Sequence, residues 1–109
     1  MVKIAICDDE KKYLDTSAAF LLEYAALRNV RFSAEQFDTP SDFLDTLDKG
    51  EHYGIYLLDD YMPGVTGVSV ATELRRRNDE SPIIFLTSSR DHAVEAFGVG
   101  ATHYLLKPY

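Results

Sequence analysis

The sequence predicts an α/β domain in which a five-stranded parallel sheet is covered by helices. Short apolar runs alternate along the chain with longer stretches that have the three- and four-residue spacing of an amphipathic helix. This alternation is typical of strand–helix–strand units, and apolar runs of about four to six residues suit strands buried on both faces. No repeat, low-complexity tract or Gly/Ser linker divides the 109 residues, so we expect a single domain with one core.

Five apolar runs are predicted to be strands. They cover residues 2–7, 31–37, 55–58, 83–86 and 104–106. The second run carries Arg31, Glu35 and Gln36 among its apolar residues. Because charged side chains suit a strand with one open side, this polarity predicts an edge strand.

Four stretches between these runs are predicted to be helices. They cover residues 14–26, 41–47, 68–77 and 92–97. Ser41 is expected to cap the second helix at its start, and Gly50 is expected to follow its end. The third helix ends in three arginines, 75–77, whose charges suit the negative end of the helix dipole and which we expect to be solvated.

Acidic residues outnumber basic ones, with 18 Asp and Glu against 11 Lys and Arg and a net charge of −7. A surface of this sign repels phosphate backbones and anionic lipid, so we expect this segment to bind neither nucleic acid nor a membrane surface. Cys7 is the only cysteine and cannot form an intramolecular disulfide, which favours a reducing, cytoplasmic setting. The apolar run before Asp8 is too short for a signal peptide or a spanning helix.

Polar side chains follow four of the five predicted strands. They are Asp8 and Asp9 after the first strand, Asp59 and Asp60 after the third, Thr87 after the fourth and Lys107 after the fifth. Because functional groups in parallel α/β sheets collect at the carboxyl ends of the strands, we expect these side chains at one rim. Clustered carboxylates repel one another, and Mg²⁺, which prefers oxygen ligands, offsets that repulsion. A lysine and a threonine suit phosphoryl oxygens, so the rim predicts a site for Mg²⁺ and a phosphoryl group with an aspartate as nucleophile.

Each of these elements has a simpler interpretation when it is taken alone. An Asp-Asp pair after a strand is commonly a turn and a helix cap. Cys7 is expected to be a small buried hydrophobe rather than a reactive thiol. His52, His92 and His103 lack the spacing of metal ligands, and we expect them to be structural or surface residues. The functional interpretation depends on the rim elements occurring together, each at the end of a different strand.

Four short motifs follow one another along the chain. They are Ile-Cys-Asp-Asp-Glu at 6–10, Leu-Leu-Asp-Asp-Tyr-Met-Pro-Gly at 57–64 with Gly67, Ile-Ile-Phe-Leu-Thr at 83–87, and Tyr-Leu-Leu-Lys-Pro-Tyr at 104–109. In this order they resemble the receiver domains of two-component response regulators over essentially the whole chain. The resemblance implies a flavodoxin-like, doubly wound sheet with strand order 2-1-3-4-5. It extends to the sub-family whose receivers precede LytTR-type DNA-binding domains.

The resemblance implies a role for each acidic rim residue. Asp59, three residues before the Met of the second motif, would be the phospho-acceptor. A continuing strand pleat sends Asp59 and Asp60 to opposite sides, which supports Asp59 over its neighbour. Asp8, Asp9, Asp59 and the backbone carbonyl of Tyr61 would hold Mg²⁺.

The resemblance also implies the groups that bind and report the phosphoryl group. Thr87 and Lys107 would bind it. When Thr87 moves toward the phosphoryl group, the side chain of Tyr104 would change its rotamer in response, as the second part of the switch. The peptide bond between Lys107 and Pro108 would be cis.

The implied function is a signalling switch. Asp59 would accept a phosphoryl group from a sensor histidine kinase, and the surface of the fourth helix and fifth strand would then change to control an output module, which we expect to regulate transcription. We expect no enzyme activity beyond the domain's own phosphorylation and dephosphorylation. Two alternatives remain open. One is a Mg²⁺-dependent phosphohydrolase of the haloacid dehalogenase type, and the other is a receiver-like module that binds partners without phosphorylation.

The resemblance implies a fifth helix after the Lys-Pro turn, and Tyr109 lies one residue past that proline. Without that helix, one face of the sheet would carry only the first helix. We therefore expect residues 1–109 to be a receiver domain truncated before its fifth helix, from a longer protein with a C-terminal output module. The alternative is that a second copy covers the face in a homodimer.

Overall fold

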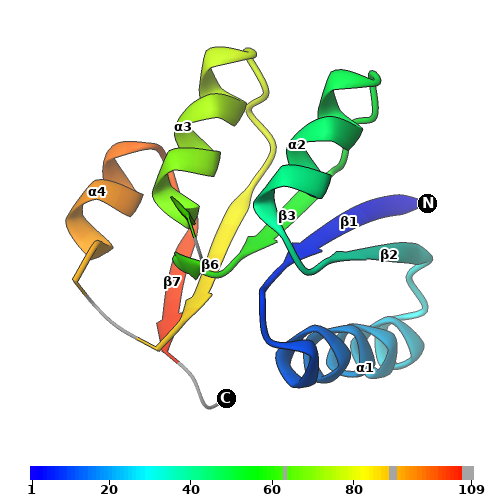
Figure 1. Cartoon of the computed structure of the whole chain (residues 1–109). Coiled ribbons are helices and arrows are strands. Elements are labelled where there is room, and N and C mark those ends of the chain that lie inside the picture. Colours follow the sequence, from blue (N-terminus) through cyan, green and yellow to red (C-terminus); the bar gives the residue numbers. More distant parts are fainter. Residues whose placement is uncertain (63, 89–90, 107–109) are drawn as a thin grey trace.

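The computed structural model describes residues 1–62, 64–88 and 91–106. For residues 20, 24 and 61 it describes the backbone but not the side chain. Its strands are β1 (Val2–Cys7), β2 (Phe32–Phe37), β3 (Ile55–Leu58), β4 (Tyr61–Met62), β5 (Val65–Thr66), β6 (Ile83–Thr87) and β7 (His103–Leu106). Its helices are α1 (Lys11–Arg28), α2 (Pro40–Asp48), α3 (Gly67–Arg76) and α4 (Ala93–Gly98) (Figure 1). None of these helices is long and apolar enough to cross a bilayer.

The main sheet has five parallel strands in the order β2-β1-β3-β6-β7. This order confirms the predicted five-stranded parallel sheet, since β6 and β7 are the fourth and fifth strands expected from the sequence. The polar strand β2 lies at the edge, as its composition predicts. The sequence did not predict the small antiparallel hairpin of β4 and β5, which follows β3.

The two faces of the sheet carry different helices (Figure 1). On one face, Phe43 of α2, Leu74 of α3 and Ala96 of α4 join a cluster of buried residues that includes Tyr56 and Phe85 of the sheet. On the other face, α1 packs through its own apolar residues against a smaller cluster from β1, β3 and β6. Strand residues alternate between the two clusters because successive side chains of a strand point to opposite faces.

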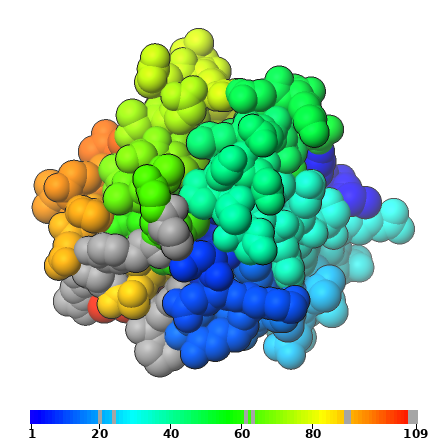
Figure 2. All heavy atoms as spheres, in the orientation of Figure 1, coloured from blue at the N-terminus to red at the C-terminus, as the bar shows by residue number. Residues whose placement is uncertain are grey.

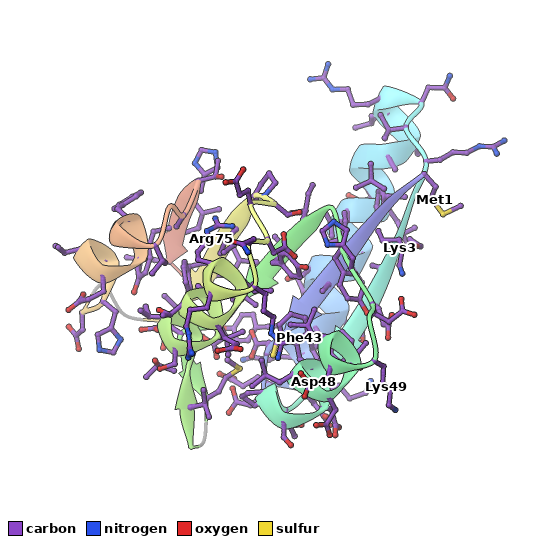
Figure 3. All side chains as sticks on the ribbon, turned by 90° about the horizontal axis from the view of Figure 1, so that it is seen from above. Met1, Lys3, Phe43, Asp48, Lys49 and Arg75 are labelled. Atoms are coloured by element: carbon purple, nitrogen blue, oxygen red, sulfur yellow. The ribbon has the colours of Figure 1, made fainter. Side chains whose placement is uncertain are left out.

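The start of α2 differs from the prediction. Thr39, not Ser41, is the N-cap, and its Oγ1 accepts a hydrogen bond of 3.1 Å from the amide of Asp42. Pro40 occupies the first turn, where its lack of an amide hydrogen costs nothing. Phe43 then points from α2 into the core (Figure 3).

Arg75 was expected to be a solvated end of α3, and this expectation is wrong. Its guanidinium and Nε donate to four backbone carbonyls, those of Asp79, Ser81, Val99 and Gly100, at 2.8–3.1 Å. The side chain therefore joins the end of α3 to the loops before β6 and after α4 (Figure 3). A charged donor on several carbonyls makes stronger hydrogen bonds than a neutral one.

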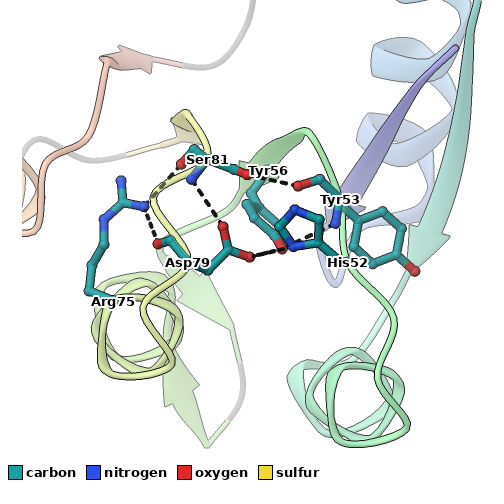
Figure 4. Close-up of polar contacts among 6 residues, drawn as sticks. All are labelled: His52, Tyr53, Tyr56, Arg75, Asp79 and Ser81. Carbon is teal, nitrogen blue, oxygen red and sulfur yellow. Dashed lines mark hydrogen bonds and ion pairs between the residues drawn. The ribbon is translucent and has the colours of Figure 1, made fainter.

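Asp79 is the centre of a polar cluster at the amino ends of β3 and β6 (Figure 4). Its carboxylate accepts hydrogen bonds from the hydroxyl of Tyr56 at 2.5 Å and from the amide of Ser81 at 3.0 Å. The imidazole of His52 lies 3.2 Å from the same carboxylate. Burial alone would raise the pKa of Asp79, but these hydrogen bonds outweigh it and hold the pKa below its ordinary value.

Gly67 lets the start of α3 pack directly on the end of β3. A Cβ at this position would lie 2.3 Å from the carbonyl oxygen of Asp59 and 2.9 Å from the Cα of Asp60. The amide of Gly67 also donates to the carbonyl of Asp60 at 2.9 Å. Close backbone approach therefore requires glycine here.

We predict that Gly67→Ala lowers the free energy of unfolding by about 1–3 kcal/mol, because the added methyl overlaps backbone atoms that cannot turn aside. Gly98→Ala is the matched control. A Cβ at Gly98 would meet nothing within 4 Å, so this change in a helix should leave stability unchanged or raise it by about 0.5–1 kcal/mol. Urea denaturation of both variants is the measurement, and equal stabilities would contradict the packing argument.

We predict that Asp79→Ala lowers the free energy of unfolding at pH 7 by about 1–3 kcal/mol, because the buried Tyr56 hydroxyl and the partly buried Ser81 amide lose their acceptor. Because the folded-state pKa of Asp79 is lowered, its contribution is present above the unfolded pKa of about 3.9 and is lost as the pH falls through the folded value. The difference between native protein and variant should therefore shrink below about pH 4. Denaturation across this pH range tests the prediction against the exposed control Asp45→Ala, and a pH-independent difference would refute it.

Candidate functional site

The register of the sheet brings the ends of four strands to one rim. Cys7 lies opposite Leu58, Leu58 lies opposite Phe85, and Thr87 lies opposite Leu106. The amide of Asp59 donates to the carbonyl of Cys7 at 2.9 Å. The residues that follow β1 and β3 therefore emerge side by side, next to the end of β6.

Three acidic residues crowd the end of β1. One carboxylate oxygen from each of Asp8, Asp9 and Glu10 lies within 4.8 Å of the others. Asp8 is buried and its Oδ1 accepts a hydrogen bond from the Glu10 amide at 2.9 Å, whereas Asp9 and Glu10 are exposed. The chain after β1 reaches the surface beside α2 (Figure 2). This donor set fits a hard divalent cation such as Mg²⁺, which takes carboxylate oxygens and keeps several waters.

Asp59 and Thr87 lie in the protein interior at the carboxyl ends of β3 and β6. Asp59 is 3% exposed and Thr87 is fully buried. The Thr87 hydroxyl has no hydrogen-bond partner among the residues that the structure describes. Leaving a buried hydroxyl unpaired costs free energy unless something else supplies the partner. An oxygen-rich group at Asp59 would be such a partner, so the orphaned hydroxyl fits a phosphoryl group at the rim.

Cys7 is a buried residue, and its thiol is not poised for reaction. Its Sγ lies 3.6 Å from the Sδ of Met62. Burial, followed by the charges of Asp8 and Asp59, raises the pKa of the Cys7 thiol to about 12. The thiol therefore stays protonated at neutral pH, in agreement with the small hydrophobe that the sequence predicts.

Asp60 faces away from the acidic cluster and is completely buried. Its Oδ1 accepts a hydrogen bond of 3.2 Å from the amide of Val68 in α3, and its Oδ2 contacts Nδ1 of His92. It therefore lies on the α3 and α4 side of the sheet, in phase with Leu58 of β3. This placement agrees with the alternation that separates Asp60 from Asp59 in the sequence analysis.

The sequence analysis missed the contact between Asp60 and His92. The hydrogen bond that the His92 ring donates to the Asp60 carboxylate, together with the charge of Asp60, raises the pKa of His92 above its ordinary value. The two residues are 32 positions apart, and no spacing rule links a strand end to the start of a helix at that separation. Only the tertiary fold, which brings the residue before α4 to the residues that follow β3, places them together.

The remaining predicted residues are partly described. Tyr104 of β7 is half-buried, and its ring centroid lies 5.8 Å from that of Phe85. The backbone of Tyr61 begins β4 immediately after the Asp59–Asp60 pair. Lys107 and the bond to Pro108 lie outside the described residues, so their predicted roles stay predictions.

Comparison with known proteins places the chain among signalling domains. The family model described as the response regulator receiver domain matches residues 4–109. The positive alginate biosynthesis regulatory protein of Pseudomonas aeruginosa is 33% identical over 107 residues, which cover 98% of this chain and 42% of that protein. The sensory transduction protein LytT of Oceanobacillus iheyensis is 40% identical over 57 residues, which cover 50% of this chain and 23% of that protein.

A solved structure agrees with the sequence matches. The BeF3-activated receiver domain of DrrB from Thermotoga maritima superposes with a TM-score of 0.81 at 28% identity, covering all of this chain and 86% of that one. The chain spans less than half the length of the curated relatives that it matches. The parallel five-stranded sheet, the acidic end of β1 and these matches lead to one conclusion: the chain belongs to the receiver domain family of two-component response regulators.

Proposed function

We propose that this domain is a phosphorylation-dependent switch that accepts a phosphoryl group on Asp59 from a sensor histidine kinase in a Mg²⁺-dependent reaction. The observation that carries the proposal is the convergence at one rim of a buried Asp59, an acidic cluster and a buried Thr87 hydroxyl without a described partner. A buried hydroxyl without a partner in the described part of the chain is uncommon at a purely structural site. Membership of the receiver family supports the proposal over the phosphohydrolase alternative.

The acidic residues would hold the metal ion and the acceptor would carry out the transfer. Asp8, Asp9, Asp59 and the backbone carbonyl of Tyr61 are the proposed ligands of Mg²⁺, which supplies charge neutralisation for the phosphoryl oxygens when it is bound. A carboxylate oxygen of Asp59 attacks phosphorus, a P–O bond forms as the P–N bond of the phosphohistidine breaks, and the imidazole recovers its electron pair. Positioning and electrostatics do most of the catalysis in such transfers.

The switch would follow from the bonding needs of the new group. The Thr87 hydroxyl donates to a phosphoryl oxygen, and Lys107 supplies the opposite charge. Movement of Thr87 then frees space that Tyr104 fills, which changes the surface of α4 and β7. Such a local charge that biases two arrangements is a common basis for signalling.

The partners are proposed from the relatives. Because the matched relatives are longer regulatory proteins, we propose that a C-terminal output module follows this domain in the full protein and controls transcription. The match to LytT favours a LytTR-type DNA-binding module for that position. This segment itself, with its net charge of −7, is not proposed to contact DNA.

We predict that beryllofluoride, a phosphoryl mimic, shifts the backbone amide resonances of native protein only when Mg²⁺ is present. Asp59→Asn should abolish the shift because it removes the acceptor carboxylate, and the exposed control Asp45→Asn should keep it. Amide NMR titration with each component omitted in turn is the measurement. No Mg²⁺-dependent shift in native protein would favour a receiver-like module that binds partners without phosphorylation.

We predict opposite effects of Thr87→Val on stability and on the response. Removing a buried hydroxyl without a partner should raise the free energy of unfolding by up to about 1 kcal/mol. The same change should weaken beryllofluoride binding, since the donor to the phosphoryl oxygen is lost. Thr72→Val is the control, because the Thr72 hydroxyl donates to the Val68 carbonyl on the exposed face of α3. Unaltered beryllofluoride affinity in Thr87→Val would argue against the proposed role of this hydroxyl.

A further inference from the structure

Asp60 is held from three directions immediately after the proposed acceptor. Its carbonyl accepts from the Gly67 amide at 2.9 Å, and its Oδ1 accepts from the Val68 amide at 3.2 Å. Its Oδ2 contacts Nδ1 of His92. A fully buried carboxylate needs such partners, since an uncompensated buried charge is strongly destabilising.

His92 connects this carboxylate to α4. It is the residue before the helix, and its carbonyl accepts a hydrogen bond of 2.9 Å from the Ala96 amide. The side chain is 32% exposed, against 0% for Asp60, so it reaches inward from the surface. The backbone of His92 thus begins α4 while its side chain bonds the residue next to Asp59.

α4 buries little of its own surface against the rest of the described chain. It is six residues long, and Ala96 is its buried residue. Val94 and Phe97 are 84% and 57% exposed. Arg75 holds the far end through the carbonyls of Val99 and Gly100. Because so short a helix is not stable alone, its position depends on tertiary attachments. The contact between Asp60 and His92 is one such attachment at the start of the helix.

We propose that Asp60 and His92 are a positioning pair that holds the start of α4 in the unphosphorylated arrangement, so that the pair opposes the switch. The inference rests on the proposed function, because it takes phosphorylation of Asp59 as the event that moves α4. Neither residue needs to touch the phosphoryl group. The pair acts by setting the equilibrium between two positions of the helix, which alters the affinity for any ligand that favours one of them.

The test combines His92→Ala with beryllofluoride titration in saturating Mg²⁺, followed by amide NMR on the whole chain. We expect His92→Ala to bind beryllofluoride about fivefold more tightly or better, the lower end of typical coupling between sites. We also expect faster hydrogen exchange at the Ala96 and Val99 amides before beryllofluoride is added. His92→Asn keeps a hydrogen-bond donor near the position of Nδ1. Its beryllofluoride affinity and amide exchange rates should therefore lie closer to those of native protein than the values of His92→Ala do. His52→Ala, which changes an exposed histidine at the opposite, amino end of the sheet, is the matched control.

Each outcome decides the question. Tighter binding in His92→Ala with recovery in His92→Asn supports the pair. Faster exchange with native or weaker affinity in both variants would show a merely structural contact and overturn the inference. If His92→Ala does not fold, Asp60→Asn takes its place in the same exchange and affinity measurements. Tighter binding in Asp60→Asn supports the pair, and native affinity overturns it. Absence of any beryllofluoride response in native protein would instead remove the proposed function itself.

Discussion

The parallel pairing of β1 with β3 is the interaction on which the rest of the rim depends. It places Cys7 opposite Leu58, and the ladder continues one bond further, from the Asp59 amide to the Cys7 carbonyl. A register shift of one residue would turn every following side chain to the opposite face of the sheet. The acids after β1 and the acid after β3 emerge at the same rim only in this register. Gly67 lets α3 lie against the backbone of Asp59 and Asp60.

The two ends of the sheet bury polar groups in different ways. At the amino ends, the Asp79 carboxylate receives two hydrogen bonds and the Arg75 side chain binds four carbonyls. At the carboxyl ends, three carboxylates crowd together and the Thr87 hydroxyl has no partner in the described part of the chain. A buried polar network whose hydrogen bonds are all made rigidifies a fold. A buried hydroxyl without a partner can still form a hydrogen bond with a bound group. This contrast separates the structural polar cluster from the candidate functional one.

Apolar runs and the polarity of single strands predicted most of the fold, because these features depend only on residues that are close together in the sequence. The apolar runs located β1 and β3 to the residue, and the polarity of β2 placed it at the edge. The sequence analysis assigned the cap of α2 to Ser41, whereas Thr39 is the N-cap, because the side chain that reaches the Asp42 amide is decided by geometry. Arg75 was assigned to solvent because its carbonyl partners at Val99 and Gly100 lie 24 and 25 residues away.

The sequence by itself determined the α/β class, the five parallel strands and the identity of the rim acids. Hydrophobic periodicity and the residue types that follow each strand depend only on residues close together in the sequence. Tertiary structure decided how the burial and the hydrogen-bond partners of those acids differ. It buried Asp60 against Val68 and His92 while leaving Asp9 and Glu10 at the surface, and it left the Thr87 hydroxyl without a described partner. The physical reason is that burial and hydrogen-bond partners depend on which distant segments pack together. Adjacent aspartates with the same chemistry thus acquire different surroundings on the two faces of one strand.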